Sequence, residues 1–100
     1  MRILVASNST SKRTDYFIKA GRSLGADTCF VTYDELSAVL PDCRDTVVKL
    51  EPPVFREADF RKYNLLCEEY RSLLSRLADT DESESVHFLN EPAAIRCALD

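Results

Sequence analysis

Glycine is scarce in this sequence, and its scarcity excludes two common routes to nucleotide binding. The 100 residues include two glycines, Gly21 and Gly25. A dinucleotide-binding loop needs the pattern G-x-G-x-x-G, and a P-loop needs a glycine-rich turn that ends in Gly-Lys-Ser or Gly-Lys-Thr. Neither pattern occurs in the chain. The sequence therefore predicts no nucleotide-binding loop of either kind.

The sequence also lacks a surplus of basic residues and a long hydrophobic run. Lysine and arginine number 13 against 17 acidic residues, a net charge of −4. Nucleic-acid-binding proteins usually carry a basic surplus on one face, and membrane-surface proteins a basic amphipathic helix. No apolar stretch approaches the roughly 20 residues that span a bilayer, and the first residues do not form a signal peptide. We expect a cytoplasmic protein that binds neither nucleic acid nor membrane.

Residue types that carry catalysis or metal binding are few. The single histidine, His87, lies in a strand-like run, and no G-x-S-x-G turn supplies a nucleophile for it. Residues 79–85 are acidic and serine-rich, but they include no glycine to shape a metal loop and are predicted to form a polar loop. No C-x-x-C pair is present, so no zinc or redox site is predicted. The four cysteines are Cys29, Cys43, Cys67 and Cys97. We predict no catalytic residue and no metal ligand in this chain.

Two hydrophobic periods alternate along the chain. Short apolar runs rich in β-branched residues are typical of strands buried in a parallel sheet, and apolar residues at steps of three and four predict helices between them. The predicted strands are residues 3–6, 29–33, 46–50 and 86–89. The predicted helices are residues 17–24, 35–40, 56–77 and 93–99. This order predicts one α/β domain over residues 1–100, with three layers (α/β/α) and a four-stranded parallel sheet.

The predicted helix over residues 56–77 shows the clearest pattern. Its apolar residues recur at steps of 3, 4, 3, 4 and 3 and so share one face of a helix. They are Phe60, Tyr63, Cys67, Tyr70, Leu74 and Leu77. A coiled coil would show the same spacing, but the stripe is short and carries aromatic residues instead of leucine and isoleucine. We expect this face to pack on the sheet.

Candidate binding residues follow the predicted strands, because ligands of open parallel sheets bind outside the carboxyl ends of the strands. Three segments qualify, residues 7–11, 51–55 and 90–92. The first places small hydroxyl groups ahead of a helix, with Lys12 and Arg13 alongside, and such a site could hold a carboxylate or a phosphate. The alternative is a serine-rich helix cap with two solvated bases. The predicted ligand contacts are Ser9, Thr10 and Asn90, whose alternative role is to cap the helices that follow.

The last twelve residues carry the most specific pattern. Residues 89–100, Leu-Asn-Glu-Pro-Ala-Ala-Ile-Arg-Cys-Ala-Leu-Asp, resemble the segment that closes the N-terminal, Rossmann-like (pre-ATP-grasp) domain of ATP-grasp proteins. In that family a strand ends in Asn-x-Pro and leads into a helix with Ala-Ile and a final Asp-Lys. The matching residues are Asn90, Pro92, Ile95, Ala98 and Asp100. The serine- and asparagine-rich first turn, and the strand that ends in Glu51-Pro52-Pro53 before a long helix, are similar to an uncharacterised branch of the family. Members of that branch often show Ser-Pro-Gly after this strand, where Pro52-Pro53 stands here.

The resemblance implies a role in an ATP-dependent carboxylate ligase. Such a parent protein activates a carboxylate as an acyl phosphate with ATP and magnesium and joins it to an amine or another nucleophile. In the family, the ATP and magnesium ligands belong to later domains. The resemblance therefore implies substrate contacts and packing against downstream ATP-grasp domains for this chain, with no cofactor and no catalysis of its own. We expect a chain truncated at its C-terminus, since the last predicted helix has no glycine or proline stop.

Two other interpretations stay open. A stand-alone α/β module could bind a protein partner or a small ligand, but such a module should end in a completed, capped helix. A small enzyme acting through Cys43 or Cys97 would need a thiol with a lowered pKa, and the sequence shows no basic cluster beside either residue.

Overall fold

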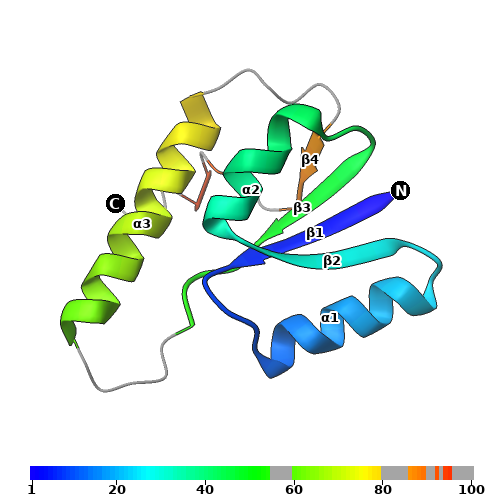
Figure 1. Ribbon diagram of the computed structural model, residues 1–100, viewed down its shortest axis with the longest axis horizontal. Helices are drawn as coiled ribbons and strands as arrows, with labels where there is room; N and C mark the ends of the chain where they lie inside the picture. The colour runs from blue at the N-terminus through cyan, green and yellow to red at the C-terminus, as the bar shows by residue number, and fades with distance from the viewer. Residues whose placement is uncertain (55–59, 80–85, 90–91, 93, 96–100) are drawn as a thin grey trace.

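Strands and helices alternate along the chain (Figure 1), as the hydrophobic periods predict. A computed structural model describes residues 1–54, 60–79, 86–89, 92, 94 and 95. The elements are β1 (Arg2–Ser7), α1 (Lys12–Ser23), β2 (Asp27–Thr32), α2 (Tyr33–Val39), a 3-10 turn η1 (Leu40–Asp42), β3 (Thr46–Leu50), α3 (Phe60–Asp79) and β4 (Val86–Phe88). No helix in this described part is both long and apolar enough to cross a membrane.

The four strands form one parallel sheet in the order β2-β1-β3-β4. Leu4 on β1 lies opposite Cys29 on β2 and Val48 on β3, so these residues share one face of the sheet. The predicted α/β class with a four-stranded parallel sheet is confirmed. It is a Rossmann-like arrangement, in which α1 covers one face and α2 and α3 cover the other (Figure 1).

The main core lies between the sheet and the pair α2 and α3. Alternate residues of each strand point into it, and full burial of one leucine or valine side chain stabilises the fold by about 1.5–3 kcal/mol. Its members are Leu4, Ala6, Val31, Tyr33, Leu36, Leu40, Cys43, Val48, Leu50, Tyr70, Leu73, Leu74 and Val86. The C-terminal half of α3 contributes to this core alongside α2, whereas Tyr63 in the N-terminal half of α3 is 40% exposed. The apolar stripe predicted on this helix is therefore buried along part of its length.

The opposite face of the sheet is covered by α1, whose packed side matches the predicted one only in part. The helical spacing of Phe17, Ala20 and Leu24 predicts an apolar face, but Phe17 is half-buried, Ala20 is exposed and Leu24, the C-cap, is 88% exposed. The buried residues are Thr14 and Gly21. Gly21 lies against Thr28 of β2, where a side chain would collide, and this close approach determines the rotation of the helix. Gly25 follows the predicted helix over residues 17–24 and has a positive φ of 85°, a conformation that favours glycine after a helix.

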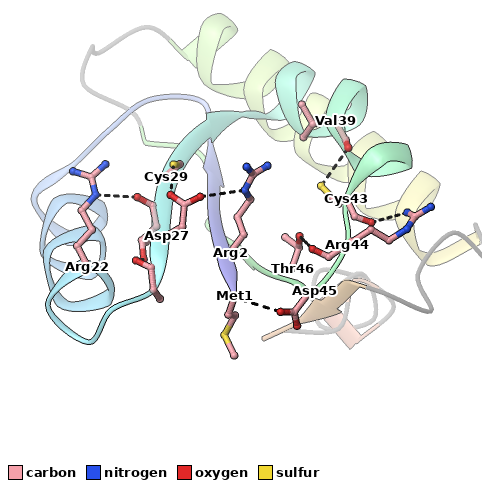
Figure 2. A network of polar contacts seen from close by, with 12 residues as sticks. Met1, Arg2, Arg22, Asp27, Cys29, Val39, Cys43, Arg44, Asp45 and Thr46 are labelled. Atoms are coloured by element: carbon pink, nitrogen blue, oxygen red, sulfur yellow. Dashed lines mark hydrogen bonds and ion pairs between the residues drawn. The ribbon is translucent and has the colours of Figure 1, made fainter.

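The amino ends of the strands are joined by a polar network (Figure 2). Arg2 on β1 pairs with Asp27 on β2 at 3.4 Å, and the N-terminal ammonium lies 3.7 Å from Asp45, the residue before β3. The guanidinium of Arg22 donates to the main-chain oxygen of Thr28 at 3.1 Å. Exposed ion pairs of this kind contribute about 0–1 kcal/mol each. This edge of the sheet is thus occupied by contacts within the chain.

Candidate functional site

The opposite edge of the sheet holds the topological switch point. β1 and β3 are neighbours, and their carboxyl ends lie side by side, but the chain leaves β1 toward α1 on one face and β3 toward α3 on the other. Ligands of open parallel sheets bind where the chain diverges in this way. The amide of Glu51 donates to the main-chain oxygen of Ala6 at 2.9 Å, which extends the pairing of the two strands to the start of the loop.

Asn8 fastens the loop after β1 to the loop after β3. Its Nδ2 donates to the main-chain oxygen of Val54 at 2.9 Å, and its Oδ1 accepts from the amide of Val54 at 2.6 Å. Ser7 Oγ also donates to the main-chain oxygen of Pro52 at 3.2 Å. The asparagine side chain thus satisfies both main-chain groups of one residue 46 positions away, as a neighbouring strand would.

A cavity of about 320 Å³ lies between these two loops. We call it the crevice. It is lined by Ser11, Lys12, Arg13, Thr14, Glu51, Pro52, Pro53 and Val54. Two of the three segments predicted from the sequence therefore come together, and the third, residues 90–92, is described only at Pro92.

One wall of the crevice is the first turn of α1. Ser11 and Thr14 form a capping box: the amide of Thr14 donates to Ser11 Oγ at 3.3 Å, and the amide of Ser11 donates to Thr14 Oγ1 at 2.7 Å. The first amides of a helix have no acceptor within the helix. Among the described residues, no acceptor is bonded to the amides of Lys12 and Arg13. This wall therefore offers hydrogen-bond donors and the positive end of the helix dipole.

The other wall offers apolar surface and no free main-chain donor. Pro52 and Pro53 have no N–H group, and the amide of Val54 is already bonded to Asn8. The two walls therefore differ in chemistry, and a ligand that suits both has an anionic end and an apolar body.

The charges around the crevice are mainly positive. Glu51 is 6% exposed, and its carboxylate forms an ion pair with Lys49. In the described part of the chain its Oε1 accepts no hydrogen bond, so the Lys49 ammonium is its compensating partner. Burial, and secondly the guanidinium of Arg13, lowers the pKa of Lys49 below its ordinary value. Because Glu51 neutralises one cation, Lys12 and Arg13 leave a positive surplus at the crevice of a chain whose net charge is −4.

Two of the three residues predicted as ligand contacts, Ser9 and Thr10, precede the first turn of α1 and do not line the crevice. Ser9 is half-buried and its Oγ donates to the main-chain oxygen of Thr10 at 3.3 Å, while Thr10 is exposed. Asn90 lies outside the described residues, so all three contacts stay predictions. Asn8 belongs to the candidate segment 7–11 but is not among the predicted contacts, although an asparagine in the turn after the first strand is a signal for a side chain that bonds to main-chain groups.

Neither His87 nor Cys43, the two described side chains considered for nucleophilic chemistry, lines the crevice. No group of three or more histidine, cysteine, aspartate or glutamate side chains among the described residues could hold a metal ion. His87 is exposed on β4. Cys43 is buried, and its Sγ donates to the main-chain oxygen of Val39 at 3.2 Å, whereas Cys97 lies outside the described residues.

The fold and the crevice define an open parallel α/β domain with a ligand-sized cavity at its switch point. A comparison with protein-family models found no match for this chain. Comparisons with curated proteins and with solved structures found no match either.

Proposed function

We propose that this chain is the substrate-side domain of an ATP-dependent carboxylate ligase and that it holds the acid in the crevice. The crevice is the main support, because a donor wall with a positive surplus faces an apolar wall at the switch point. The resemblance of residues 89–100 to the end of a pre-ATP-grasp domain supports the ligase class. We further propose that the protein acts in the cytoplasm.

The proposed binding mode assigns one role to each wall. The carboxylate accepts hydrogen bonds from the free amides of Lys12 and Arg13, whose side chains add positive charge. An anion at a helix N-terminus gains about 0.3–1 kcal/mol when exposed and up to about 2 kcal/mol when partly buried. The apolar body of the acid lies against Pro52, Pro53 and Val54. This mode predicts a preference for short monocarboxylates with an apolar chain over inorganic phosphate.

The chain's own contribution to the proposed reaction is to bind and orient the acid. The described residues do not fit ATP or magnesium, since they include neither a glycine-rich phosphate loop nor a cluster of metal-binding side chains. ATP and magnesium would activate the carboxylate as an acyl phosphate on downstream domains. Calorimetry of this chain with ATP and magnesium should therefore show no tight site, and a tight magnesium-dependent site would contradict the proposal.

The crevice is tested by titrating the protein with isobutyrate and recording amide chemical shifts. We expect shifts concentrated at the amides of residues 11–14, Glu51 and Val54, all of which line the crevice. Arg13→Gln should weaken binding about tenfold, the effect of losing about 1.4 kcal/mol. Lys19→Gln is the matched control, because Lys19 is an exposed cation of the same helix that does not line the crevice. Equal losses in the two variants, or shifts scattered over the surface, would overturn the proposal.

A stand-alone ligand-binding module is the second candidate. Every residue that lines the crevice belongs to this chain, so binding does not require another domain. The reading frame beyond residue 100 in the gene distinguishes the two candidates. A further segment of domain size with glycine-rich turns and spaced lysines and acids favours the ligase, and a stop codon favours the module.

A further inference from the structure

Tyr33 connects the main core to one wall of the crevice. It is the first residue of α2 and is 2% exposed. Its hydroxyl donates to the main-chain oxygen of Glu51 at 2.6 Å, a buried contact between residues 18 positions apart. Glu51 is the first residue of the segment 51–54, which we call the crevice arm. A core side chain thus holds the main chain of a segment that lines the cavity.

The crevice arm is fixed at both of its ends. At Glu51 the amide donates to Ala6 at 2.9 Å, while the carbonyl oxygen accepts from Tyr33. At Val54 both main-chain groups are bonded to Asn8. Between these residues are two prolines, whose φ angles are restricted to about −65°. Once both ends are held, the arm has few ways to move relative to α1.

The ring of Tyr33 is itself held in place. It stacks on Tyr70 of α3 with the ring centroids 5.5 Å apart and an interplanar angle of 29°. Burial raises the pKa of Tyr33 well above that of an ordinary tyrosine, so the hydroxyl keeps its proton and remains a donor. The donor therefore has a fixed position and a fixed protonation state at neutral pH.

We infer that Tyr33 is a positioning residue for the crevice: through the main-chain oxygen of Glu51 it sets the distance between the crevice arm and the first turn of α1. Tyr33 is not among the residues that line the cavity, so it acts on a ligand through the arm. The effect on binding rests on the proposed function of the crevice, whereas the effect on the arm does not.

The test compares two buried tyrosines, each changed to phenylalanine. Tyr33→Phe removes the donor and keeps the ring that stacks on Tyr70. Tyr70→Phe is the matched control, since Tyr70 is 5% exposed and belongs to the same stack. Amide hydrogen exchange is measured at Val54 and Glu51, and isobutyrate affinity is measured by titration. In Tyr33→Phe we expect exchange at Val54 to accelerate and affinity to fall, each by about fivefold to tenfold, the loss of about one hydrogen bond.

The two readouts separate the inference from the proposed function. If exchange at Val54 is unchanged in Tyr33→Phe, or accelerates equally in Tyr70→Phe, Tyr33 does not position the arm and the inference is overturned. If exchange accelerates only in Tyr33→Phe but wild-type protein binds no isobutyrate, the proposed function fails and the positioning of the arm stands. If exchange accelerates while affinity is unchanged, the arm does not control binding and the inference is overturned.

Discussion

Gly21 is the residue at which α1 and β2 come closest. A Cβ atom at this position would lie 2.2 Å from Oγ1 of Thr28 and 3.0 Å from its Cβ. Thr28 is fully buried and cannot turn away into solvent. An added methyl group must therefore displace either the helix or the strand.

We predict that Gly21→Ala lowers the free energy of unfolding by about 1–3 kcal/mol, the usual cost of overpacking. The sign of this change tests the collision with Thr28, because alanine in a helix interior is otherwise favoured over glycine by about 1 kcal/mol. Urea denaturation measures the change. In the background of Thr28→Ala, Gly21→Ala should cost less, because the side chain that the added methyl group meets is shortened. A variant as stable as the wild type would contradict this account.

At the scale of elements, the start of α1 depends on its capping box. Ser11 Oγ accepts from the amide of Thr14, and the hydroxyl of Thr14 accepts from the amide of Ser11. We predict that Ser11→Ala lowers the free energy of unfolding by about 1 kcal/mol, with a range of about 0.5–2 kcal/mol. Thermal and urea denaturation measure the loss. Ser9→Ala, which removes an exposed contact to Thr10, should change stability by no more than about 0.5 kcal/mol.

The existence of each strand could be predicted from the sequence, but helix faces and helix starts could not. Apolar spacing in α1 indicates a helix, yet its buried residues are Thr14 and Gly21, and Leu24 is the exposed C-cap beyond the end of the helix. Asp34 looks like the cap of the next helix, but α2 begins at Tyr33 because the side chain of Thr32 accepts from the amide of Glu35 at 3.2 Å. Close approaches and competing caps depend on tertiary neighbours, which a periodic pattern does not contain.

At the scale of the whole molecule, two tyrosines in the core make the free energy of unfolding fall at alkaline pH. Burial raises the pKa of both Tyr33 and Tyr70 above the ordinary value of about 10. Above that pH the unfolded chain loses protons that the folded chain keeps. The stabilisation is therefore complete below about pH 10 and is lost as the pH rises above it, by up to about 1.4 kcal/mol per pH unit for each tyrosine.

The measurement is a series of urea denaturations between about pH 8 and about pH 11. Other groups titrate in this range, so the informative quantity is the difference between the wild type and Tyr33→Phe. This difference should shrink as the pH rises above about 10. A difference that stays constant across the range would show that Tyr33 ionises alike in the folded and unfolded chains.

How far the candidate site could be predicted depended on strand order. Alternating periods indicate a parallel sheet and put the candidate loops, residues 7–11 and 51–55, at its carboxyl edge, and described residues of both segments line the crevice. Which loops meet follows from the placement of β1 beside β3, and the order β2-β1-β3-β4 has no local signature. The contact of Asn8 with Val54 joins residues 46 positions apart, so no short sequence motif predicts it. The ligase class remains a prediction.

The central position of β1 has a consequence for synthesis on the ribosome. β1 lies between β2 and β3, yet it precedes both in the chain. Its apolar run at residues 3–6 therefore emerges from the exit tunnel before either neighbour exists and stays unpaired until residues 27–32 emerge. The nascent sheet therefore grows outward from β1, whose apolar run has no strand partner during that interval.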